Sequence, residues 1–221
     1  MARRTILSSR LWLIALAMVL PISGWGCSIL ATGLWIIDPN DTEAEYRGLK
    51  EQRVAVVCRA GAASQMEAAG ATHEIARQVS QLLKKNVPRI HLISQRDVDD
   101  WLDNNEMKSC EQLGKALRAD KVVAIDLTQM SLYDGKTLYQ GRGQASITVF
   151  DIADKSSVEL RPLDVAYPPT NGVSIDIPER QFRARFLEVM CGQIARRFYR
   201  YDSREIDDNF YSETPIGFSS H

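Results

Sequence analysis

The residues of this sequence that could do chemistry are a run of aspartates, three histidines and four cysteines. The aspartates could together bind a hard cation such as Ca²⁺, and they are Asp97, Asp99, Asp100 and Asp103. A calcium loop also needs a turn glycine, which is missing here. Aspartates also favour the first turn of a helix, where they face the positive end of its dipole. We therefore expect a solvated helix face and no metal site.

The histidines and cysteines do not form a catalytic or metal-binding pattern. His73, His91 and His221 are scattered, and the cysteines form neither a C-x-x-C pair nor a zinc-ligand spacing. A catalytic cysteine needs a base beside it, and no set of nucleophile, base and orienting residue can be assembled from the sequence. The sequence therefore predicts a protein that is not an enzyme and holds no cofactor.

Three of the cysteines belong to the predicted folded domain. Cys58 and Cys191 stand in apolar surroundings, so we expect inert core thiols there. In an oxidising compartment, at most one disulfide can form among Cys58, Cys110 and Cys191. The sequence leaves open whether any of them pair.

The fourth cysteine follows a segment that is typical of export. Arginines precede an apolar run over residues 11–22, which makes a basic region followed by a hydrophobic one. The segment ends in Gly24-Trp25-Gly26-Cys27, and small residues before a cysteine resemble the lipobox of bacterial lipoproteins. The resemblance implies cleavage after residue 26 and a lipid anchor, including palmitate, on Cys27. Ser28 replaces the aspartate that retains enterobacterial lipoproteins at the inner membrane, so an outer-membrane destination is favoured.

An uncleaved membrane helix is the alternative for the same segment. A helix over residues 11–37 would be about 40 Å long, enough to cross a hydrocarbon core of about 30 Å. Pro21, Gly24 and Gly26 would weaken that helix in its middle, so the sequence favours the lipoprotein signal. In both cases the arginines stay in the cytoplasm, and the domain lies in the periplasm, anchored to a membrane of the cell envelope.

The chain divides into four parts by composition. Residues 1–26 are the predicted signal peptide, 27–50 a polar tether, 51–200 a folded domain, and 201–221 a polar tail. A net charge of −1, with 45% apolar and 25% charged residues, is typical of an ordinary globular protein. No global field points to nucleic acid as a partner.

The sequence of the domain predicts an α/β fold of the α+β sandwich kind, which is a mixed sheet of about five strands with helices packed on it. The continuous apolar run over residues 53–58 is typical of a central strand that is buried on both faces. Other strands are expected near residues 90–93, 122–127, 140–152 and 158–167, the last at an edge or with a bulge at Pro162. Helices are expected near residues 72–86, 94–102, 109–119 and 178–200.

The centre of the domain is a helix followed by a long β-hairpin. Ser109 is expected to cap the helix, and Gln112 to bond back to the backbone N–H of the cap. Asp134-Gly135 predicts the hairpin turn. The second hairpin strand alternates apolar and polar residues, so one of its faces should be open. The candidate partner-binding residues on that open face are Gln140, Arg142, Gln144 and Thr148.

The last helix carries arginines on the side opposite its phenylalanine stripe, and they are Arg180, Arg183, Arg185, Arg196, Arg197 and Arg200. A basic helix can bind nucleic acid or anionic lipid, but export argues against nucleic acid. A solvated helix face is the favoured interpretation. Docking on an anionic partner or on lipid headgroups is the alternative.

Three segments of the domain together resemble one group of bacterial proteins. They are Arg53-Val54-Ala55-Val56-Val57, then Leu113-Gly114-Lys115-Ala116-Leu117-Arg118-Ala119-Asp120 with the strand that follows, and Ile147-Thr148-Val149-Phe150-Asp151-Ile152. The group is the periplasmic α/β domain of the curli-assembly lipoprotein, the penicillin-binding-protein-activator lipoproteins and the TolB amino-terminal domain. The resemblance covers about residues 53–199, and it implies a lipid-tethered domain that binds another envelope protein.

We therefore expect a membrane-tethered, non-enzymatic envelope lipoprotein that acts as an adaptor or accessory subunit. The alternative is a small-ligand or lipid-binding component of an envelope transport system, which would need an apolar pocket between the last helix and the sheet. The sequence identifies neither the partner protein nor the oligomeric state.

Overall fold

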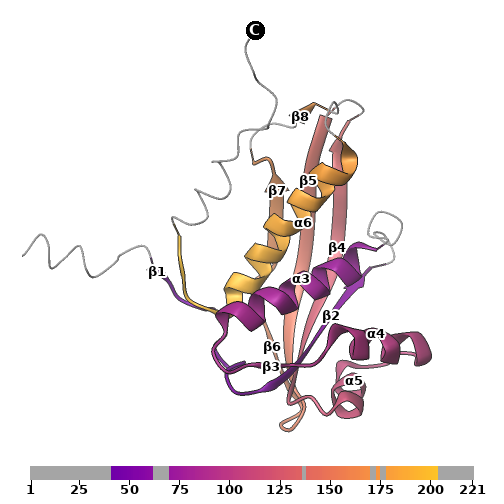
Figure 1. Ribbon diagram of the computed structural model, residues 1–221, viewed down its shortest axis with the longest axis vertical. Coiled ribbons are helices and arrows are strands. Elements are labelled where there is room, and N and C mark those ends of the chain that lie inside the picture. The colour runs from indigo at the N-terminus through magenta and orange to yellow at the C-terminus, as the bar shows by residue number, and fades with distance from the viewer. Residues whose placement is uncertain (1–40, 62–69, 136–137, 170–172, 175–177, 204–221) are drawn as a thin grey trace, which may run out of the picture. The chain divides into compact units, whose positions relative to one another are not determined.

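The structure is a computed structural model that describes residues 41–61, 70–135, 138–169, 173–174 and 178–203 (Figure 1). The predicted signal peptide, the alternative anchor over 11–37, Cys27 and most of the tail lie outside the described residues. The chain divides into two compact units, Met1–Asp41 and Thr42–His221, and every described residue except Asp41 belongs to the second.

The elements follow in this order: β1 (Asp41–Thr42), β2 (Arg53–Ala60), α3 (Ala71–Asn86), β3 (His91–Leu92), α4 (Gln95–Asn104), α5 (Cys110–Leu117), β4 (Lys121–Asp134), β5 (Leu138–Asp151), β6 (Ser156–Glu159), β7 (Leu163–Tyr167), β8 (Val173–Ser174), α6 (Glu179–Ala195), the 3-10 turn η3 (Arg196–Phe198) and β9 (Tyr201–Asp202). The short strands β1 and β9 pair with each other. The remaining strands form one seven-stranded sheet.

The large sheet is mixed, as the sequence predicts. Its continuous path is β3-β2-β4-β5-β6, and β7 and β8 also pair with β5. β2 runs parallel to β3 and β4, whereas β5 is antiparallel to all four of its neighbours. The fold is therefore α+β, with the expected five strands in one path and two further strands along β5.

The strand expected over 158–167 is two strands, β6 and β7, with a break between them. Leu160 still donates its backbone N–H to Ile147 of β5, at 2.9 Å. Pro162 has no N–H to donate. The N–H of Arg161 turns away from β5 and binds the Glu45 carboxylate at 2.6 Å. At this break the backbone N–H of Arg161 is not used in the sheet, and both this N–H and the Arg161 guanidinium contact Glu45.

Two helices, α3 and α6, cover one face of the sheet (Figure 1). Val54 and Val56 of β2 belong to the core under these helices, while Ala55 and Val57 belong to a smaller core with α4 and α5. This arrangement explains the continuous apolar run of β2, since adjacent side chains of a strand point to opposite faces. On this second face of the sheet, opposite α3 and α6, the part that α4 and α5 do not cover is polar.

Glycines in β5 allow α6 to lie close to the strand. A Cβ atom on Gly141 would stand 2.5 Å from Cγ of Phe186, and one on Gly143 would stand 3.0 Å from Sδ of Met190. Phe186 and Met190 are fully buried. The stripe of α6 therefore fills the space above the sheet, and the apolar pocket that a ligand-binding protein would need there is occupied by side chains.

Of the two hydrogen bonds predicted for the cap of α5, one is present and the other has a different donor. The Ser109 hydroxyl accepts the backbone N–H of Gln112 at 3.1 Å, as expected. The Gln112 side chain accepts the N–H of Lys108 at 3.2 Å, one residue before the predicted donor. The extended backbone of Ser109 brings both bonds to the same end of α5.

The junction between α5 and β4 explains the motif Leu-Gly-x-x-Leu-x-Ala-Asp. Arg118 ends the helix in the left-handed conformation, with φ 54°, and Ala119 donates its N–H to the Gly114 carbonyl at 2.8 Å. The Asp120 carboxylate then accepts the N–H of Arg53 at 2.7 Å, which ties the start of β4 to β2. The motif thus forms the joint that connects α5 to β4 and bonds β4 to β2.

Candidate functional site

The four candidate residues of β5 differ in exposure. Arg142 and Gln144 are exposed, Thr148 is half-buried, and Gln140 is only 6% exposed. Gln140 is buried because its amide is used within the fold: its oxygen accepts Nε and Nη2 of Arg142, at 3.1 and 2.8 Å. Gln140 therefore orients Arg142 rather than forming part of the open surface.

The open polar surface extends over three more residues that the sequence analysis did not single out. Arg59 of β2 and Asp126 of β4 lie opposite each other and form an ion pair at 2.7 Å. Asp164 of β7 lies opposite Gln144 and accepts its amide at 3.2 Å. We call Arg59, Asp126, Arg142, Gln144 and Asp164 the open face. The local alternation of β5 predicts Arg142 and Gln144, whereas only the registers of the pairing strands place Arg59, Asp126 and Asp164 beside them.

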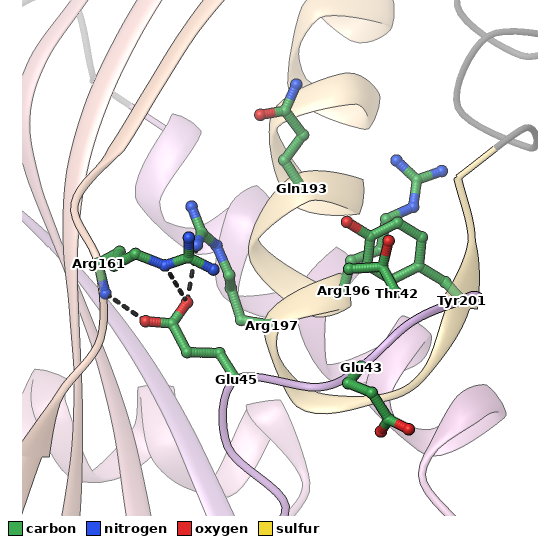
Figure 2. A pocket seen from close by; sticks show the side chains of 8 residues that line it. All are labelled: Thr42, Glu43, Glu45, Arg161, Gln193, Arg196, Arg197 and Tyr201. Atoms are coloured by element: carbon green, nitrogen blue, oxygen red, sulfur yellow. Dashed lines mark hydrogen bonds and ion pairs between the residues drawn. The ribbon is translucent and has the colours of Figure 1, made fainter. Parts of the chain in front are cut away.

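A second site lies where the chain enters the domain. The Glu45 carboxylate accepts the backbone N–H of Arg161 at 2.6 Å and Nη1 of Arg197 at 2.7 Å, and Nε of Arg161 lies 3.5 Å away (Figure 2). Partial burial raises the pKa of Glu45, but these hydrogen bonds and the two arginine charges outweigh it and hold its pKa below the usual value. Glu45 thus stays a carboxylate and contacts both arginines.

A cavity of about 300 Å³ opens beside this carboxylate. The residues that line it are Thr42, Glu43, Glu45, Arg161, Gln193, Arg196, Arg197 and Tyr201. Figure 2 shows the guanidinium of Arg196 above the ring of Tyr201, and the distance from its central carbon to the ring centre is 5.5 Å. We call these eight residues the arginine pocket.

The walls of the arginine pocket are held by backbone and ring contacts. Tyr46 donates its N–H to the carbonyl of Arg197 at 3.0 Å, and its ring meets Phe198 edge to face at 6.4 Å. Leu49 is almost fully buried. The end of the predicted tether therefore packs on the domain. Arg196 and Arg197 belong to the basic side expected for the last helix, whereas Glu45 and Arg161 carried no sequence signal.

The remaining chemical groups have structural partners. His73 pairs with Asp99 at 3.0 Å, and no three His, Cys, Asp or Glu residues of the described chain converge as metal ligands. Cys58, Cys110 and Cys191 are free thiols. Burial raises the pKa of Cys191 to about 12 and also raises that of Cys58. Among the described residues, no helix has both the length and the apolar character to span a membrane.

Comparison of the sequence with protein-family models and with curated proteins finds no match. Among solved structures, the chain is similar to the PelC dodecamer from Paraburkholderia phytofirmans, with a TM-score of 0.46 and 8% identity over 73% of this chain and 96% of that one. It is similar to the hypothetical protein CT253 from Chlamydia trachomatis, with a TM-score of 0.36 and 13% identity over 73% and 97% of the two chains. It is also similar to lipoprotein GNA1162 from Neisseria meningitidis, with a TM-score of 0.35 and 14% identity over 65% and 95%. The similar structures thus include a bacterial lipoprotein, and they identify no specific family.

Proposed function

We propose that this protein is a membrane-tethered, non-enzymatic lipoprotein of the bacterial envelope that acts as an adaptor or accessory subunit. Acylated Cys27 would anchor it, and the domain would lie in the periplasm. The open face would bind another envelope protein. The specific group named by the sequence resemblance, the outer-membrane destination and the palmitate all belong to this proposal.

One observation carries the proposal: the open face is exposed and polar, while the opposite face of the sheet is covered by α3 and α6. The open face holds two arginines and two aspartates, so its charge is balanced. Interfaces of this kind gain specificity from complementary charges and hydrogen bonds more than from apolar burial. A polar protein surface is the partner that fits it.

Tethering gives such a surface a mechanism. A lipid anchor confines the domain to one membrane, which raises its effective concentration at a partner in that membrane. A modest intrinsic affinity between the open face and the partner then suffices for stable association. No covalent step is involved, which agrees with the raised pKa values of the cysteine thiols.

Site-specific photo-cross-linking in intact cells tests the proposal. A benzophenone amino acid replaces Arg142 or Gln144 in the full-length chain, and Lys85, an exposed residue of α3 on the other side, serves as the control position. We expect one discrete cross-linked product from positions 142 and 144 and none from position 85. Identical products from all three positions, or none from the open face, would overturn the proposal.

The arginine pocket favours a second candidate, a ligand-binding accessory component of a transport system. The apolar pocket that this function would need under α6 is filled by Phe186 and Met190. The arginine pocket is polar and lies at the carboxyl end of that helix, where Gln193 of α6 is part of its lining. A ligand of the second candidate would therefore be a charged molecule and not an apolar one.

A further inference from the structure

We propose that the arginine pocket binds a phosphate group, either of a phospholipid headgroup or of a soluble phosphate compound. The inference does not depend on the adaptor role of the open face. It rests on three guanidinium groups that come from two separate segments and line one cavity: Arg161 from the break after β6, and Arg196 and Arg197 from η3.

The end of a helix alone does not account for the three arginines, because Arg161 comes from a different element. Cations are favoured at the carboxyl end of any helix, which accounts for Arg196 and Arg197. Arg161 belongs to the sheet side, and the Glu45 carboxylate joins it to Arg197. Glu45 thus contacts both guanidinium groups at once (Figure 2).

Donor groups remain after Glu45 is satisfied. A guanidinium has five N–H groups, and Glu45 contacts only Nε of Arg161 and one terminal nitrogen of Arg197. Arg196 lies on the Tyr201 ring, which orients it without occupying its N–H groups. Glu43 forms an ion pair with Arg47, which is not part of the lining. The lining therefore has a surplus of positive charge.

The chemistry and size of the cavity favour phosphate. Arginine matches phosphate oxygens with two parallel hydrogen bonds. Arg161 and Arg197 line the cavity on the side of Glu45, and Arg196 lines it on the side of Tyr201 (Figure 2). Thr42, Gln193 and Tyr201 add neutral donors. A volume of about 300 Å³ is at the lower end of ligand cavities, which suits a headgroup-sized molecule.

The position of the pocket in the chain makes a lipid source reachable. Residues 28–41 separate Cys27 from Thr42, and 14 extended residues span at most about 50 Å. An acylated Cys27 would keep the pocket within that distance of the bilayer. A soluble phosphate compound would bind whether or not a bilayer is near, so an experiment with and without lipid can distinguish the two sources.

The first test uses the purified full-length chain and inorganic phosphate, with calorimetry and the thermal midpoint as readouts. We expect phosphate to bind and raise the midpoint, and Arg196→Gln to weaken binding at least about tenfold. Arg196→Lys should bind with intermediate affinity, because it keeps the charge but loses the paired donors. Arg180→Gln, at the exposed start of α6, is the matched control and should bind like the parent. Equal binding by Arg196→Gln, or tighter binding of succinate than of phosphate, would overturn the proposal.

The second test identifies the source. The full-length chain is inserted in phosphatidylcholine vesicles with or without phosphatidylglycerol, and modification of single arginines by phenylglyoxal is followed by mass spectrometry. Protection of Arg161 and Arg196, but not of Arg180, by phosphatidylglycerol indicates a lipid headgroup. Protection by inorganic phosphate alone indicates a soluble ligand. Protection by neither contradicts the phosphate site.

Discussion

Glu45 is the residue on which the arginine pocket depends most directly. We expect Glu45→Gln to lower the free energy of unfolding by about 1–2 kcal/mol at neutral pH, because it removes the charge from three contacts that stay partly open to solvent. Glu43→Gln is the control, since the Glu43 side chain is 58% exposed and its ion pair should contribute little. Urea unfolding of both variants and the parent measures the difference.

The same variant has a defined pH dependence. The pKa of Glu45 is lowered in the fold, so its stabilisation is present above the unfolded pKa near 4.5 and is lost as pH falls through the lower folded value. The gap between the parent and Glu45→Gln should therefore be full at pH 7 and should close below pH 4.5. A gap that stays constant down to pH 3 would mean that Glu45 acts through packing rather than charge.

Gly141 tests how closely α6 approaches the sheet. A methyl group at this position would meet the ring of Phe186, whose Cγ lies 2.5 Å from the added Cβ, so either the ring or α6 must move. We expect Gly141→Ala to destabilise the fold by about 1–3 kcal/mol. Gly143→Ala is the comparison and should cost less, because its Cβ would lie 3.0 Å from Sδ of the flexible Met190 and 3.1 Å from Cζ of Phe186, both longer than the contact at Gly141. Equal losses in chemical denaturation would contradict this difference between the two sites.

Cys191 lies on α6 and faces α3, where its thiol contacts the carbonyl of Ile75 at 3.9 Å. Burial raises its pKa to about 12, so the native thiol should not react with iodoacetamide at pH 8. The unfolded chain is the control, and its thiols should be labelled fully. Since unfolded cysteine ionises near pH 9, the fold should lose stability as pH rises from 9 towards 12. Rapid native labelling of Cys191, detected by mass spectrometry, would refute its burial.

At the scale of elements, the joint between α5 and β4 should contribute measurably to stability. Asp120→Ala removes the acceptor of the Arg53 N–H, and we expect a loss of about 1 kcal/mol. Asp120→Asn keeps an oxygen at the same place and should lose less. Thermal unfolding of the two variants makes the comparison. If both were as stable as the parent, the backbone bond from Asp120 to Arg53 alone would be holding the joint.

The elements that could be predicted are those whose signals are local. The apolar run of β2, the Ser109 cap and the hairpin turn each depend on neighbouring residues, and each is confirmed. The break between β6 and β7 was expected only as an edge or a bulge, because it depends on where the Arg161 N–H finds an acceptor. That acceptor, Glu45, lies 116 residues away in the chain. The arginine pocket was missed for the same reason.

At the scale of the whole molecule, one side of the sheet is filled and the other is partly free. Phe186, Met190 and Ile194 close the side under α6, so a ligand could enter there only by displacing the core. Within the described part of the chain, the open face and the arginine pocket are two polar surfaces that are available for contacts with other molecules. Burying the charged groups of either surface in the interior of a bilayer would cost free energy, so both suit an aqueous environment.

The attachment of the whole molecule to a membrane depends on residues outside the described part, and its chemistry can be tested directly. If Cys27 is the acylated residue, mass spectrometry of the cellular protein should find a mature chain that begins at Cys27 and carries fatty acid. Cys27→Ala should abolish incorporation of radioactive palmitate and leave the chain at precursor length, whereas Cys58→Ala should keep the label. An uncleaved helix over 11–37 would instead give an intact Met1 and the same membrane association in both variants. Such a chain would still be anchored, by a membrane helix about 40 Å long in place of a lipid. The distance that the arginine pocket could reach from the bilayer would then be set by the residues between 37 and Thr42.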